Sequence, residues 1–86
     1  MPELSRFYGI IIRMFYGDQL PPRFHAIHEG EECQVNINTL EAIDGFIGRR
    51  AEALVYQWAA THRDELRQAW TMARRHQAPV KIQPLD

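Results

Sequence analysis

Cysteine is nearly absent from this chain of 86 residues. Cys33 is the one thiol, so the chain cannot form an internal disulfide, and a lone thiol is more typical of a reducing cytosol than of a secreted scaffold. Long apolar runs are also missing, because no stretch approaches the roughly 20 apolar residues that span a bilayer. The N-terminal region lacks the basic start and the small-residue cleavage site of a signal peptide. We therefore expect a soluble, cytoplasmic protein that does not bind membranes.

Several sequence motifs that support chemistry are missing too. The chain contains no HExxH or CxxC motif, no paired zinc-ligand spacing and no glycine-rich phosphate loop. It has no serine or cysteine nucleophile in a sharp turn, no helix-turn-helix pattern with a glycine turn and no ribonucleoprotein aromatic motif. These absences predict a protein without a metal or cofactor and favour a role other than that of an enzyme.

Charge is present but unevenly distributed. The net charge is −1, which by itself argues against a dedicated nucleic-acid binder. Residues 18–44 contain six acids against one arginine, a net charge of −5, whereas residues 49–81 contain seven bases against three acids, a net charge of +4. A polarised surface of this kind steers a complementary partner, a second copy of the chain or a polyanion.

The first half of the chain has the patterns of β-strands. Residues 9–16 are β-branched and aromatic, residues 23–28 follow two prolines, and residues 33–38 alternate so that Cys33, Val35 and Ile37 share one face. Gly30 marks a hairpin turn between the second and third of these segments. The segment 40–45 is ambiguous, because Leu40 and Ile43 fit either a short strand that ends at Asp44-Gly45 or a single helical turn, and we favour a short strand or an irregular segment. The patterns predict an antiparallel meander.

The second half is helical in pattern. Apolar residues recur at helical spacing from about residue 48 to residue 77, with a break near "THRD", where Thr61 and Asp64 resemble a capping box. Val80 and Ile82 then alternate, which predicts a short strand over 79–83. We predict a single α+β domain over 1–86, with a strand-rich half at about 7–45. Its architecture would be a small antiparallel three- to four-stranded sheet with two helices packed on one face.

The stretch "PPRFHAIH" is the most functional in character. Alternation along a strand would place Phe24, Ala26 and His28 on one face, and Arg23 and His25 on the outward face. Two histidines split in this way cannot share a metal without a bulge, so we expect recognition rather than metal binding. A small hydrolase or nuclease centred on His25 and His28 remains a second alternative, because a histidine beside an acid is sufficient for general acid–base chemistry.

Two further sets of residues suggest binding. The aromatic residues Tyr8, Phe15, Tyr16 and Tyr56 do not all fit inside so small a core, and exposed aromatics are typical of protein-interaction surfaces. Tyr56 lies off the apolar stripe of its helix, so it joins Arg23, His25 and His28 as a candidate recognition residue. A second set favours contact with DNA or RNA phosphates, although a solvated helix face is the commoner explanation. Its members are Arg49, Arg50, Arg63, Arg67, Arg74 and Arg75.

The ordered segments "MPELSRFYGIIIRMFYGD", "PPRFHAIH", "LVYQWAATHRDELRQAW" and "IQPL" resemble the bacterial domain of unknown function 4160 family, from Met1 to about Leu85. Arg23 stands where a histidine is usual in that family, so His25 alone matches its His-Phe-His pair. The resemblance implies a small prokaryotic domain of unsettled activity, encoded beside another small domain in an arrangement similar to toxin–antitoxin modules. We therefore expect a non-enzymatic interaction domain that binds a small partner protein or forms a homodimer. A nucleic-acid-binding regulator is the first alternative.

Overall fold

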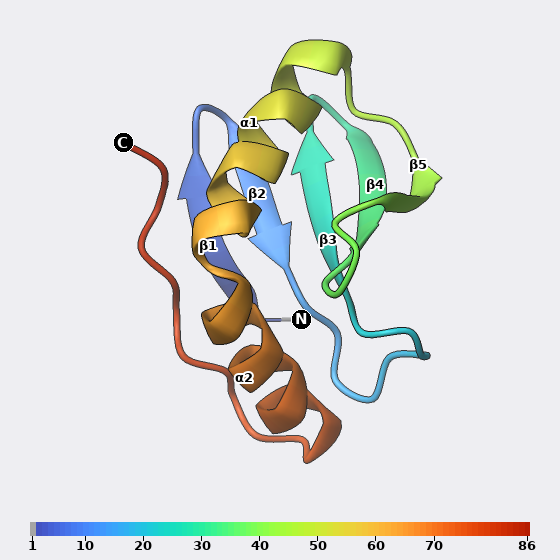
Figure 1. Cartoon of the computed structure of the whole chain (residues 1–86), viewed down its shortest axis with the longest axis vertical. Coiled ribbons are helices and arrows are strands. Elements are labelled where there is room, and N and C mark those ends of the chain that lie inside the picture. The colour runs from blue at the N-terminus through green and yellow to red at the C-terminus, as the bar shows by residue number, and fades with distance from the viewer. Residues whose placement is uncertain (1) are drawn as a thin grey trace.

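The computed structural model describes residues 2–86, which form five strands and two helices (Figure 1). The elements are β1 (Glu3–Phe7), β2 (Ile10–Arg13), β3 (Arg23–His28), β4 (Glu31–Asn36), β5 (Ala42–Gly45), α1 (Arg49–Thr61) and α2 (Arg63–Arg74). The α+β class is confirmed. The strand count was too low, because three or four strands were predicted and the described chain contains five.

All five strands belong to one antiparallel sheet in the order β1-β2-β3-β4-β5, so each strand pairs with its neighbour in sequence. Two-residue turns connect β1 to β2 and β3 to β4. Their central residues have positive φ, namely 50° at Tyr8, 76° at Gly9, 50° at Glu29 and 81° at Gly30. This conformation matches the twist of the flanking strands. The predicted turn at Gly30 is therefore a tight hairpin.

Strand β1 was not predicted, and its turn explains why. A strand was expected over residues 9–16, so the prediction began inside this turn and left no hairpin at Tyr8-Gly9. The strand also departs from regular alternation, because both Leu4 and Ser5 are buried next to a register shift against β2. A regular period-2 pattern therefore does not show in the sequence of β1.

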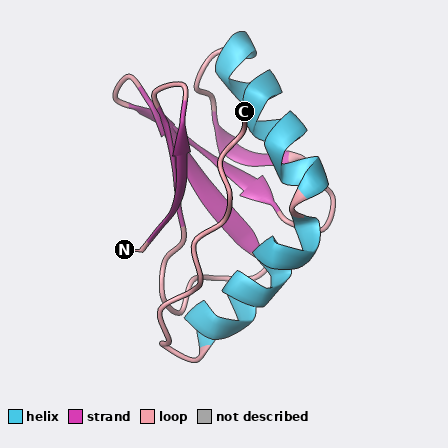
Figure 2. Ribbon diagram, turned by 90° about the vertical axis from the view of Figure 1, so that its left-hand side faces the viewer, coloured by secondary structure: helices cyan, strands magenta, loops and turns pink. Residues whose placement is uncertain are grey.

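Helix α1 packs on the sheet through Trp58, whose side chain is fully buried. The Trp58 ring lies 5.4 Å from the ring of Phe7 on β1 and 5.9 Å from the ring of Phe24 on β3. Both helices lie on the same side of the sheet (Figure 2). Helix α2 buries Leu66, Ala69, Trp70 and Ala73, at the helical spacing seen in the sequence.

The expected capping box between the two helices does not form. The Thr61 hydroxyl donates a hydrogen bond to the Trp58 carbonyl oxygen at 3.0 Å instead of accepting one from the next helix. His62 directly follows the last residue of α1, where its backbone N–H bonds to the Ala59 carbonyl oxygen, and it is also the residue before α2, where its side chain makes no capping bond. Because one residue serves as the junction, the chain has no room for a separate capping residue before α2.

The segment after α2 does not form the strand predicted over 79–83. The Ile82 amide donates to the Leu4 carbonyl oxygen at 2.8 Å, and Ile82 is buried, but Val80 is exposed rather than inward-facing. Pro79 and Pro84 have no N–H to donate, so the segment cannot maintain a ladder of hydrogen bonds. It remains an extended strap beside β1, fixed by single contacts such as the 2.8 Å bond from Trp58 Nε1 to the Gln83 carbonyl oxygen.

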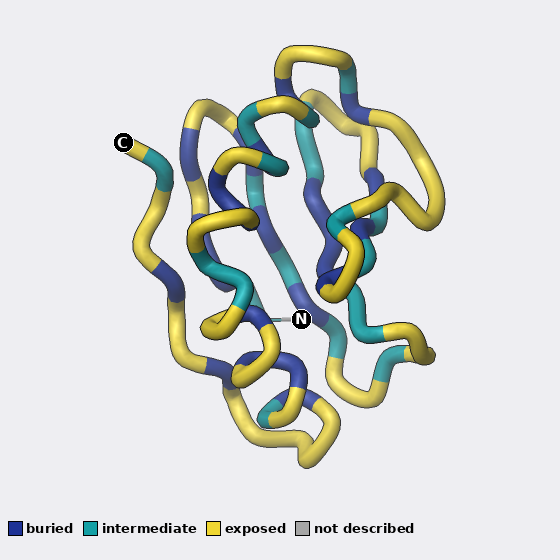
Figure 3. The backbone as a smooth tube through the Cα atoms, viewed as in Figure 1, coloured by how far each residue is buried: buried dark blue, intermediate teal, exposed yellow. Residues whose placement is uncertain are grey.

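Figure 3 shows how far each residue of the sheet and the helices is buried. The core lies between the sheet and the helices, while every residue of β5 is exposed. Within residues 2–86, neither helix has the length and apolar composition needed to cross a membrane.

Candidate functional site

The two histidines of "PPRFHAIH" lie on opposite faces of β3. Phe24 and Ala26 are fully buried, and His28, on their side of the strand, borders α1. Arg23 and His25 lie on the other face, which the helices leave uncovered. The alternation of the strand therefore separates His25 from His28, and the structure does not bring them together as one acid–base site.

His25 is held between two carboxylates. Its Nε2 lies 2.9 Å from Oδ2 of Asp18, which comes from the loop between β2 and β3. Its Nδ1 lies 2.9 Å from Oε2 of Glu32, a diagonal neighbour on β4. The ring of Phe15 packs edge-on against the imidazole, with 4.3 Å between ring centres. His25, expected to face outward with Arg23, is in fact only 4% exposed, because the loop and Phe15 cover it.

This geometry defines the chemistry of the imidazole. A carboxylate oxygen only accepts hydrogen bonds, so both ring nitrogens of His25 are satisfied when both carry a proton. Asp18 is also committed on its other oxygen, since Oδ1 accepts a 2.7 Å bond from the Gln19 amide. The two partners lie on different elements, so the His25 ring joins the loop between β2 and β3 to β4.

Arg23 closes the rim of the same site. Its guanidinium donates to Oε1 of Gln34 at 2.7 Å and to the carbonyl oxygens of Leu20 at 3.2 Å and Pro21 at 3.4 Å. These bonds hold the loop between β2 and β3 against β4. They leave an open, mostly polar hollow of about 540 Å³ on the uncovered face, bordered by Phe15, Tyr16, Asp18, Arg23, His25, Gln34 and Asp44.

The thiol of Cys33 adds no nucleophile to this hollow. It lies in the core with 1% exposure. Burial, with smaller contributions from the charges of Glu52 and Glu32, raises the pKa of Cys33 to about 11. The thiol is therefore protonated at neutral pH, and the nucleophilic thiolate is scarce.

Tyr56 was expected on the surface, but it is half-buried. Its hydroxyl donates to Oε1 of Glu52 at 3.2 Å, and burial together with the Glu52 charge raises the pKa of Tyr56 to about 12. Tyr8 at 57% and Phe46 at 59% are instead among the large apolar side chains that are exposed. Phe46 was overlooked because it follows Asp-Gly in a segment without clear periodicity.

The six arginines of the helical half do not form a single patch. Arg49 and Arg50 start α1 at one end of the molecule, whereas Arg74 and Arg75 lie at the far end of α2 (Figure 1). Arg67 lies 3.6 Å from Oδ1 of Asp64, and Arg74 stacks over Trp70 with 5.6 Å to the ring centre. Arg63 is half-buried. This distribution provides separate charges rather than a continuous track for a phosphate backbone.

Metal ligands do not converge in residues 2–86. No group of three or more histidine, cysteine, aspartate or glutamate side chains is placed to hold an ion. Asp18 and Glu32 belong to one cluster, but they contact different nitrogens of the His25 ring and so do not face a common point.

Comparison with known families identifies the chain. A family model described as "Domain of unknown function (DUF4160)" matches residues 9–71. The chain belongs to this family. No curated protein and no solved structure compared with the chain matches it.

The DUF4160 match covers the whole hydrogen-bonded cluster. Asp18, Arg23, His25, Glu32 and Gln34 all lie within residues 9–71. Strand β1 and the C-terminal strap lie outside the matched range. The resemblance seen in the sequence extended to both ends of the chain, whereas the family match is confined to β2 through most of α2.

Replacing His25 with leucine is expected to lower the free energy of unfolding by about 1–3 kcal/mol, because two carboxylates lose their donor. Asp18, with a side chain 15% exposed, recovers less hydration than Glu32, which is 44% exposed. Urea denaturation at neutral pH measures the loss. Glu32→Gln is the matched control, since its amide oxygen still accepts from Nδ1, and it should lose clearly less. Equal stability of His25→Leu and the unaltered chain would show that the cluster contributes nothing.

Proposed function

We propose that this DUF4160 chain is a non-enzymatic interaction domain that binds a small partner protein at the free edge of β5. The observation that carries the proposal is the state of this edge. β5 ends the sheet, all four of its residues are exposed, and Ile43 and Phe46 present apolar side chains with 38% and 59% exposure. An open edge strand offers unpaired N–H and C=O groups to an added strand.

The opposite edge of the sheet supports the choice of β5. The C-terminal strap lies beside β1, where the Ile82 amide bonds to the Leu4 carbonyl oxygen. Trp58 and Tyr8 hold the strap further along, through the carbonyl oxygens of Gln83 and Asp86. The chain itself therefore occupies the β1 side, and β5 is the edge left for another polypeptide.

Charge indicates the chemistry of the partner. Glu41 and Asp44 border or belong to β5, within the acidic region 18–44. A complementary strand would carry basic residues beside alternate apolar ones that cover Ile43 and Phe46. We propose such a strand in a small partner protein, in an arrangement similar to a toxin–antitoxin pair.

The test is light scattering coupled to size-exclusion chromatography, on the chain alone and after co-expression with the protein of the neighbouring gene. The expected result is a complex that survives purification and that Ile43→Lys/Phe46→Lys abolishes, because the substitution adds like charges to the approach of a basic strand. Val80→Lys is the matched control, since Val80 is 71% exposed but lies on the strap. The proposal is contradicted if the complex still forms with the Ile43→Lys/Phe46→Lys variant, or if the chain stays a monomer after co-expression. A homodimer that the same variant dissociates would show that the β5 edge is the binding surface and that the partner is a second copy of the chain.

The same chromatography separates this function from nucleic-acid binding. Affinity built on phosphate contacts falls steeply with salt, whereas a strand pairing with apolar anchors changes far less. Because the six arginines do not form a continuous patch, we expect the complex to persist at high salt.

A further inference from the structure

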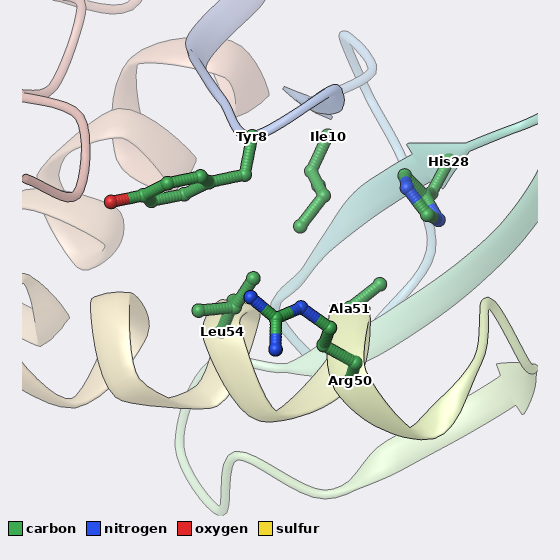
Figure 4. A pocket seen from close by; sticks show the side chains of 6 residues that line it. All are labelled: Tyr8, Ile10, His28, Arg50, Ala51 and Leu54. Atoms are coloured by element: carbon green, nitrogen blue, oxygen red, sulfur yellow. The ribbon is translucent and has the colours of Figure 1, made fainter.

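A second cavity lies on the helix side of the sheet, away from the His25 cluster. It has a volume of about 240 Å³ and opens beside the start of α1. Tyr8 comes from the turn between β1 and β2, Ile10 from β2 and His28 from the end of β3, while Arg50, Ala51 and Leu54 come from α1 (Figure 4). None of these residues belongs to β5.

The interior of the cavity is apolar. Ile10 is fully buried and Ala51 is 4% exposed, and the small side chain of Ala51 leaves the space between the helix and the sheet open. Tyr8 and Leu54 form the sides. The Tyr8 hydroxyl donates to the Asp86 carbonyl oxygen and lies at the end of the ring farthest from His28 in Figure 4. The ring of Tyr8, rather than its hydroxyl, therefore faces a ligand.

Two side chains with nitrogen donors, Arg50 and His28, stand at the opening. Within residues 2–86, the guanidinium of Arg50 has no hydrogen bond or ion pair with another side chain, and in Figure 4 it extends over Leu54 between Tyr8 and His28. Nε2 of His28 comes no closer than 4.0 Å to the nearest carboxylate, that of Glu29, which is 83% exposed. The opening thus offers two nitrogen donors that the protein has not used.

The start of α1 strengthens this positive field. The helix begins after Gly48 without a side-chain cap, so its first amides have no partner from a capping residue. Glu52, the acid in the first turn, is committed elsewhere, because its carboxylate accepts from the Ile47 amide at 3.0 Å and from the Tyr56 hydroxyl. Helix N-termini favour anions, so the first turn of α1, which supplies Arg50 and Ala51 to the lining, adds to the positive potential beside the cavity.

From these observations we propose that the cavity binds a small carboxylate with an apolar body. The body lies against Ile10 and Ala51, and the carboxylate pairs with Arg50, with His28 as a second donor. A guanidinium matches the two oxygens of a carboxylate with two parallel hydrogen bonds. The volume is below the roughly 300–1,000 Å³ of drug-sized sites, so the ligand is a single ring or a short branched chain.

Phenylacetate is a suitable probe, compared with the neutral phenylacetamide, which has the same shape. Titrations followed by ¹H–¹⁵N NMR should show saturable shifts at Tyr8, Ile10 and Ala51, with a dissociation constant on the order of 1 mM for so small a ligand. Phenylacetamide should bind about tenfold more weakly, because it lacks the charge that Arg50 recognises. Equal binding of the two probes, or no saturable shifts with phenylacetate, would overturn the proposal.

Variants locate the site. Arg50→Gln should weaken phenylacetate binding about tenfold, whereas Arg49→Gln, its neighbour on the same turn, should leave the affinity unchanged because Arg49 does not line the cavity. Ala51→Leu should abolish binding by filling the space. Circular dichroism and the thermal midpoint confirm that each variant is folded, and His28→Gln gives a second readout if Ala51→Leu fails to fold. Equal losses for Arg49→Gln and Arg50→Gln would mean that charge alone attracts the probe and that the cavity is not its site.

Discussion

Replacing Trp58 with alanine is expected to lower the free energy of unfolding by about 3–5 kcal/mol. The fully buried ring packs against Phe7 and Phe24, which belong to strands β1 and β3, so its removal opens a cavity beneath α1. The substitution also leaves the Gln83 carbonyl oxygen without the indole donor that holds the C-terminal strap. A chain of this length has a total stability of about 4–13 kcal/mol, so the loss is a large fraction of the whole.

Urea denaturation followed by far-ultraviolet circular dichroism measures this loss. Trp58→Phe is the matched control, since it keeps most of the ring volume but lacks the indole N–H. The free energy of unfolding of Trp58→Phe should lie between that of Trp58→Ala and that of the unaltered chain. If Trp58→Ala and Trp58→Phe unfold at the same denaturant concentration, packing beneath α1 is not the source of the stability.

Replacing Gly45 with alanine is the second large effect we expect, at about 3–5 kcal/mol from a strained backbone together with an overpacked contact. Gly45 has a φ of 79°, and a Cβ added there would clash with the Glu32 carbonyl oxygen and lie 3.0 Å from Cα of Cys33. Both atoms belong to the backbone of β4, so neither can move aside as a flexible side chain would. The expected consequence is detachment of β5 from the sheet.

Gly30→Ala separates the two causes. Gly30 has a φ of 81°, close to that of Gly45, but an added Cβ would meet nothing within 4 Å. It should lose only about 1–2 kcal/mol, the cost of the left-handed conformation. Thermal unfolding compares both variants, and hydrogen exchange at the amides of 42–45 reports on β5 directly. Equal losses for the two glycine variants would show that the contact with β4 is unimportant.

The fold was predictable where local pattern and tertiary structure agree. The alternation of Cys33, Val35 and Ile37 and the glycine turn before it are visible in the sequence because strand period and turn chemistry coincide there. β1 was missed because the strand expected over 9–16 began inside its turn, and because Leu4 and Ser5 are both buried and break the regular alternation. The strand expected over 79–83 was wrong because two prolines interrupt its hydrogen bonding, while the burial of Ile82 comes from β1, far away in the sequence.

The candidate site was predictable only in part. Strand alternation was sufficient to place His25 and His28 on different faces. It was not sufficient to find Asp18, because the loop between β2 and β3 folds back over the strand and no periodicity describes such a return. The same loop buries His25, which alternation alone placed outward. Tyr56 was expected to be exposed because it lies off the apolar stripe of its helix. It is half-buried because its hydroxyl bonds to Glu52, which lies one helical turn away.

The strap beside β1 affects how this protein folds during its synthesis. Leu4, Trp58 and Tyr8 each make a hydrogen bond to residues 82–86, which are synthesised after all five strands and both helices. On the ribosome, β1 therefore stays without its outer cover until the strap has emerged. During that interval the β1 edge is open to a chaperone or to another unfinished chain.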